Sequence, residues 1–191
     1  MSAAEYATAL RAVYDRATAE DVRNGRMWYY TARGELWDLS KRYRVSLKRT
    51  AYAAAALSNN MEWGANVALL EHVLHVLTRG IGRPRGHYAP CLRKATAIIR
   101  RGEFGALRGP KVVPFAAALY GDMSAAVIDR HMWRAASGDK FTNLTDKRSA
   151  DCAAALRRVA RDVRKPVAEV QAVIWVVQRR GDDPSQAPIP F

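Results

Sequence analysis

Apolar side chains in this chain recur at intervals of three and four residues, and this spacing determines the class of fold. Between residues 63 and 77 the apolar positions are Trp63, Val67, Leu70, Leu74 and Leu77, which lie on one face of an α-helix. Comparable patterns, bounded by glycine, proline and capping residues, predict helices over 6–17, 28–43, 47–57, 91–101, 112–120, 129–136, 146–163 and 166–180. The alternation typical of strands does not occur. We therefore predict one compact all-α domain over residues 1–180, followed by a flexible proline-rich tail over 181–191.

The charge of the chain is strongly positive and unevenly distributed. Its 31 Lys and Arg face 18 Asp and Glu, which gives a net charge of +13. Basic residues cluster at 41–49, 79–85, 93–101 and 157–165. Clustered positive charge favours a polyanion, because each neutralised phosphate releases condensed counterions. DNA is the partner that we predict, and an acidic membrane surface or an acidic protein is the alternative.

Several other classes of protein are disfavoured. No apolar run approaches the length of a membrane span, and the N-terminus lacks the pattern of a signal peptide. We expect a cytoplasmic protein without a membrane partner, in the host cytoplasm if the chain is phage-encoded. Cys91 and Cys152 are too few for an iron–sulfur cluster, so we expect buried thiols and no cofactor. His72 and His75 lack a third ligand at a recognisable spacing, so no metal is predicted.

Three short segments contain the side chains best suited to catalysis or to DNA binding. Leu107-Arg-Gly-Pro-Lys111 predicts a glycine turn that leads into a helix. Asp129 follows eighteen residues after Lys111 and can cap the next helix. Asn59-Asn60 ends an alanine-rich helix, where it would form an ordinary turn or a DNA contact.

In their order and spacing these segments resemble the helix-hairpin-helix DNA glycosylase superfamily, over roughly residues 47–136, about half of the chain. The family has a glycine hairpin that ends in lysine, and a valine-aspartate-any-histidine motif that begins a later helix. The resemblance implies that Lys111 is a nucleophile for a sugar C1′, and that Asp129 stabilises an oxocarbenium-like transition state or transfers a proton. It also implies DNA-binding roles, which fall on Asn59, Asn60, Arg108, Gly109, Arg130 and His131. Asn59 or Asn60 would fill the space that a flipped nucleotide leaves.

The C-terminal segment 169–179 is similar to small phage-encoded relatives that are linked to hypermodified thymine. Gln171 and Trp175 lie at i and i+4, where they would line a pocket. The implied function is cleavage of an N-glycosidic bond, or hypermodification of a base, in DNA. The alternatives are a DNA-binding or regulatory module without catalysis, and a basic protein that binds an acidic host protein. For Asp129 an ordinary helix cap, and for Lys111 a phosphate contact or a solvated lysine, are the competing interpretations.

Overall fold

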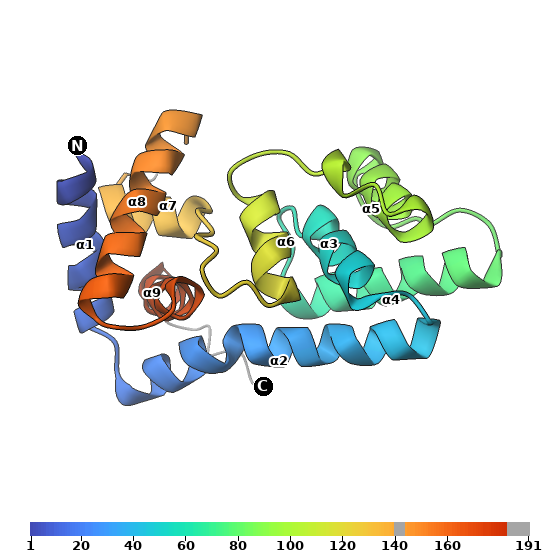
Figure 1. The fold of residues 1–191 in the computed structure, drawn as a ribbon, viewed down its shortest axis with the longest axis horizontal. Helices are drawn as coiled ribbons and strands as arrows, with labels where there is room; N and C mark the ends of the chain where they lie inside the picture. Colours follow the sequence, from blue (N-terminus) through green and yellow to red (C-terminus); the bar gives the residue numbers. More distant parts are fainter. Residues whose placement is uncertain (140–143, 183–191) are drawn as a thin grey trace. The chain divides into compact units, whose positions relative to one another are not determined.

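The computed structural model describes residues 1–139 and 144–182, and within these ranges the chain is all-helical, as predicted (Figure 1). Neither range contains a β-strand. The helices are α1 (Ala3–Asp15), α2 (Ala19–Tyr43), α3 (Leu47–Leu57), α4 (Trp63–Arg79), α5 (Ala89–Arg101), α6 (Val112–Tyr120), α7 (Arg130–Ser137), α8 (Asp146–Asp162) and α9 (Val167–Asp182), with a 3-10 helix η1 (Phe104–Ala106) between α5 and α6. Because α9 continues through Asp182, the predicted tail begins too early. The rest of that tail, 183–191, lies outside the described residues.

Contacts between residues divide the chain into two compact units. The first unit comprises residues 1–31 together with the C-terminal part from residue 122, and the second comprises residues 32–121. The predicted single domain over 1–180 therefore stays a prediction.

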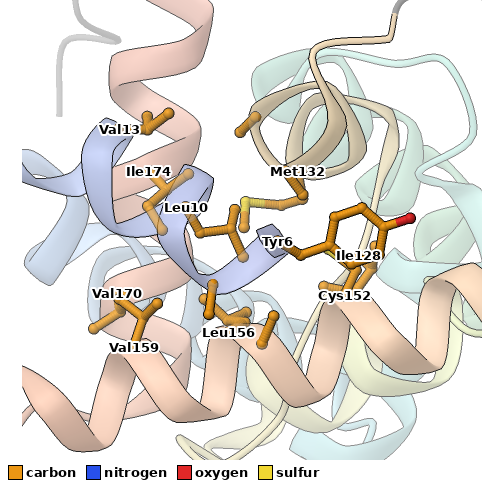
Figure 2. Close-up of a cluster of buried hydrophobic side chains, with 14 of the residues drawn as sticks. Tyr6, Leu10, Val13, Ile128, Met132, Cys152, Leu156, Val159, Val170 and Ile174 are labelled. Carbon is orange, nitrogen blue, oxygen red and sulfur yellow. The ribbon is translucent and has the colours of Figure 1, made fainter. Parts of the chain in front are cut away.

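The core of the first unit is built by α1, α7, α8 and α9 (Figure 2). Its most deeply buried large side chains are Leu10, Ile128, Met132, Leu156 and Ile174, each at most 1% exposed. Leu10 and Ile174 lie on the apolar faces that the spacing predicted for the first and the last helix, whereas the burial of Ile128, Met132 and Leu156 was not predicted. Burial of such side chains stabilises the unit by about 1.5–3 kcal/mol each.

Helix α2 begins nine residues before the predicted start at residue 28, so that boundary was wrong. Thr18 and Asp21 form a reciprocal cap: the Thr18 N–H donates to Asp21 Oδ2 at 2.8 Å, and the Asp21 N–H donates to Thr18 Oγ1 at 3.2 Å. Gly25 lies inside the helix and packs closely against α9. A Cβ atom at this position would lie 2.6 Å from Val173 Cα and from Val173 N. Thus a glycine that weakens the helix pattern in the sequence serves the contact between two helices.

The second unit is organised around α3, whose bounds agree with the prediction. This helix packs against α4, α5 and α6, and its buried alanines at 51 and 53–56 are at most 5% exposed. Small side chains let the neighbouring helices approach closely. The predicted stripe on α4 is confirmed at Leu70 and Leu74, but Val73 and Val76 are buried in place of Val67 and Leu77, which are half-buried.

The described residues add three facts about thiols, membranes and metals. Cys152 is buried as expected, whereas Cys91 is only partly buried, because it lies in the first turn of α5. Among the described helices, none combines the length and the apolar character that a membrane crossing needs. In the same part of the chain no three His, Cys, Asp or Glu side chains are grouped so that they could hold a metal ion.

Candidate nucleic-acid interface

The structure divides the predicted site residues between the two units. Those in the second unit are Asn59, Asn60, Arg108, Gly109 and Lys111. Those in the first unit are Asp129, Arg130, His131, Gln171 and Trp175. Lys111 and Asp129, which the resemblance joins in one reaction, therefore belong to different units.

The positive charge of the chain is concentrated in the second unit. Residues 32–121 hold 15 Lys and Arg against 5 Asp and Glu, a net charge of +10, and the remaining residues hold 16 against 13, or +3. Three of the four basic clusters lie in this unit, at 41–49, 79–85 and 93–101. Most of these side chains are exposed. A field of one sign over a small unit attracts polyanions.

The turn 107–111 projects from the second unit and is anchored at its first residue. Leu107 is 4% exposed, whereas Arg108, Gly109 and Pro110 are exposed. Leu107 stands where the resembled family has its first hairpin glycine, so a buried side chain replaces a flexible residue there. Gly109 has φ 96°, a conformation that L side chains rarely adopt. The predicted glycine turn before α6 is thus confirmed.

Helix α6 begins at this turn without a side-chain cap. Lys111 occupies the N-cap position, its carbonyl accepts from the Phe115 N–H at 3.0 Å, and no side chain bonds the first turn. Among the described helices α4 and α5 also begin without a side-chain cap, whereas side chains cap α1, α3, α7 and α8. The first N–H groups of α6, at Val112 and Val113, therefore remain available to an external acceptor. With the helix dipole and the lysine, they form a surface suited to a phosphate.

The turn that contains Asn59 and Asn60 follows α3. Both asparagines are exposed, and Asn60 adopts the left-handed conformation with φ 52°. Beyond this turn, the Trp63 ring contacts the Phe115 ring with centroids 6.5 Å apart. This contact packs the start of α4 against the first turn of α6. The turn at Asn59 and Asn60 therefore leads into the helix that begins at Trp63, and the turn 107–111 leads into the helix that contains Phe115.

In the first unit, Asp129 caps α7 as predicted, and its carboxylate lies among buried polar groups. Asp129 Oδ1 accepts from the Met132 N–H at 2.9 Å. Burial, reinforced by the negative charge of Asp129, raises the pKa of the Cys152 thiol to about 12. The same two causes raise the pKa of Tyr29. The Tyr29 hydroxyl donates to Gln171 Oε1 at 2.8 Å, so a buried pair links α2 with α9 beside this carboxylate.

Trp175 is half-buried at the edge of the same region. Its ring centroid lies 6.0 Å from that of His131 and 6.3 Å from that of Trp28. The Arg179 guanidinium lies 4.8 Å from its centroid. Arg130 is exposed, and Gln171 is buried. We call Tyr29, Asp129, His131, Gln171 and Trp175 the Asp129 cluster.

The triplet Trp28-Tyr-Tyr30 favours a core position over base stacking, so Trp28 and Tyr29 were not predicted as neighbours of this cluster. The structure buries Tyr29, half-buries Trp28 and leaves Tyr30 exposed. The partners of the first two on α9 lie more than 140 residues further along the chain, so no local pattern marks them.

The fold and the surface together define a basic all-helical protein. The chain belongs to a family of unknown function, DUF7178, whose model matches residues 1–182. No curated protein and no solved structure shows significant similarity to the chain.

Proposed function

We propose that this protein binds DNA through its second unit. The observation that carries the proposal is the concentration of positive charge there, +10 of the total +13 on residues 32–121. Solubility needs no such asymmetry, whereas binding along a phosphate backbone does. An acidic host protein is the alternative partner for the same charge, since its carboxylates would also bind a helix N-terminus.

The 107–111 turn is the proposed phosphate grip. We propose that α5, the connection 102–111 and α6 form a helix-hairpin-helix motif. Gly109 lets the backbone approach a phosphate, the first N–H groups of α6 bind its oxygens, and Arg108 and Lys111 neutralise its charge. Pro110 supplies no N–H, so the two side chains carry more of this interaction than in the resembled family. Asn59 and Asn60 are proposed to contact the bases or the sugar edge of the same duplex.

Binding to duplex DNA at increasing salt tests this function. We expect affinity at low salt that falls steeply, with a log–log slope of about −0.9 for each phosphate neutralised. Fluorescence anisotropy with a labelled duplex measures it. Absence of affinity for any duplex at low salt would contradict the proposal and would favour a protein partner.

Chemistry on a DNA base is the second candidate function, and the Asp129 cluster favours it. The partly buried Asp129 carboxylate lies close enough to Tyr29 and Cys152 to help raise their pKa values, and a carboxylate in such surroundings suits stabilisation of an oxocarbenium-like sugar. Stacking on Trp175 would hold a base that has left the duplex. In this candidate water attacks C1′ while Asp129 stabilises the positive charge on the sugar, and the base leaves with its bonding electrons, to be protonated by an acid or by water. Lys111, which lies in the other unit, is a separate candidate nucleophile for a sugar C1′. The products would be the free base and an abasic sugar that carries the oxygen of the attacking water; hypermodification of the base is the alternative reaction, and the target base is open.

Replacing Asp129 by Asn separates its two roles. Asparagine caps a helix about as well as aspartate, so we expect stability and DNA affinity to change little. Release of a modified base should fall by about 100-fold or more, because the carboxylate charge is lost. Release measured by chromatography checks this, with borohydride trapping on abasic DNA for the Lys111 amine. Undiminished release would remove Asp129 from catalysis, and absence of both release and trapping by the unaltered chain would leave DNA binding as the function.

A further inference from the structure

The loop that joins α4 to α5 carries arginines among glycines and a proline. The sequence predicts a loop over Arg79-Gly-Ile-Gly-Arg-Pro-Arg-Gly86, and the structure leaves 80–86 without helix, while Arg79 is the last residue of α4. The proposed grip at 107–111 does not involve this loop, which lies at the other end of α5 (Figure 1). It is nevertheless one of the basic clusters of the second unit.

The loop is held at both ends and is unsupported between them. At its start the Ile81 N–H donates to the Val76 carbonyl at 3.2 Å, and Gly80 is left-handed with φ 69°. At its end Gly86 packs against α4, where a Cβ atom would lie 3.6 Å from Leu69 Cδ1. Residues 82–86 make no backbone hydrogen bond to another described residue. The segment thus has no regular secondary structure, with bends at Gly82 and Gly86, and its backbone groups are free of hydrogen bonds to the described backbone.

The arginines of this segment face outward and are unengaged. Arg83 and Arg85 are exposed and form no ion pair with a described residue. Pro84 between them is half-buried and fixes the backbone of the pair. Ile81 and Tyr88, 60% and 56% exposed, flank them with apolar surface.

We propose that residues 80–88 form an arm that enters the minor groove of A·T-rich duplex DNA. The minor groove is only about 6 Å wide and excludes a helix, but it admits one extended chain. Glycines on both sides of the arginine pair add no bulk, and arginine is favoured in the narrow, strongly negative groove of A·T tracts. The wide minor groove of an RNA duplex offers no comparable fit. Ile81 and Tyr88 can contact sugars at the groove edges.

Helix α5 lies between this arm and the connection 102–111 that carries the phosphate grip. The helix has 13 residues, which at 1.5 Å per residue separates its ends by about 20 Å. That distance corresponds to about six base pairs of duplex at 3.4 Å per step. The arm precedes α5 and the grip follows η1 in the same unit, and we propose that both engage one duplex. This inference rests on the proposed DNA binding and adds the sequence class that is preferred.

Affinities for duplexes of equal length, one with a central A·T tract and one G·C-rich, test the arm. We expect the unaltered chain to prefer the A·T duplex by about tenfold, and Arg83→Ala/Arg85→Ala to lose this preference while still binding the G·C duplex. Arg93→Ala/Lys94→Ala, which removes two exposed charges from α5, is the matched control. It should weaken binding to both duplexes by the same factor.

The outcomes distinguish this inference from the function on which it rests. Equal affinity of the unaltered chain for both duplexes overturns the arm and leaves DNA binding intact. A preference that survives in the Arg83/Arg85 variant also overturns it. Tighter binding to an RNA duplex of the same sequence would reject the minor-groove assignment, and no binding to any duplex would reject both proposals. Circular dichroism of each variant verifies that the helices remain.

Discussion

Replacing Gly25 by Ala is expected to lower the free energy of unfolding by about 2 kcal/mol, although alanine is the better helix former. The added Cβ would lie 2.6 Å from the backbone of Val173, so α2 and α9 must move apart. Overpacking of this kind costs up to about 3 kcal/mol, and the helix propensity of alanine returns about 1 kcal/mol. Because backbone atoms are involved, rotation of a side chain cannot relieve the clash.

Gly34→Ala on the same helix is the matched control. No atom lies within 4 Å of the position that its Cβ would occupy. This variant should be more stable than the unaltered chain by about 0.5–1 kcal/mol. Urea unfolding followed by circular dichroism measures both. If Gly25→Ala gained stability as Gly34→Ala does, the close contact of α2 with α9 would be wrong.

Replacing Arg108 and Lys111 together by Ala is expected to weaken DNA binding by on the order of 100-fold at moderate salt, since each charged contact with a phosphate is worth about 1.5 kcal/mol. Stability should change little, because Arg108 is exposed and neither side chain forms an ion pair with a described residue. Anisotropy titrations of one labelled duplex give the ratio of affinities directly.

The control for this variant is Arg157→Ala/Arg158→Ala on α8, which removes the same charge from the first unit. Both arginines are exposed. Long-range attraction alone would make the two double variants equally weak, whereas a local grip predicts a much smaller loss for the α8 pair. Equal losses of DNA affinity in the two double variants would therefore contradict a local phosphate contact at the 107–111 turn.

Helix bounds were predictable where the chain carries local start and stop signals. The segments 47–57 and 112–120 match α3 and α6, because a serine precedes the first and Gly109-Pro110 and Gly121 bracket the second. The start of α2 was missed because its cap uses aspartate in place of the usual glutamate, and because Gly25 interrupts the pattern. Local propensity could not reveal that Val173, far along the chain, demands a glycine there.

The candidate site was likewise predictable only in part. The cap made by Asp129 and the turn at Gly109 follow from residue type and position, and both are confirmed. The pairing of Tyr29 with Gln171 depends on how α2 and α9 pack, which no spacing rule gives. The concentration of charge in one unit likewise needed the unit boundaries. The roles of Lys111 and Asp129 in a reaction remain predictions.

The salt dependence of DNA binding by the unaltered chain and by Arg108→Ala/Lys111→Ala tests the central claim most directly. If the 107–111 turn grips two phosphates, the slope of log affinity against log salt concentration should be shallower in the variant by about 1.8, or 0.9 for each contact. The Arg157→Ala/Arg158→Ala control should retain most of the original slope. A slope that is the same in the unaltered chain and in the Arg108/Lys111 variant would contradict the proposed DNA grip.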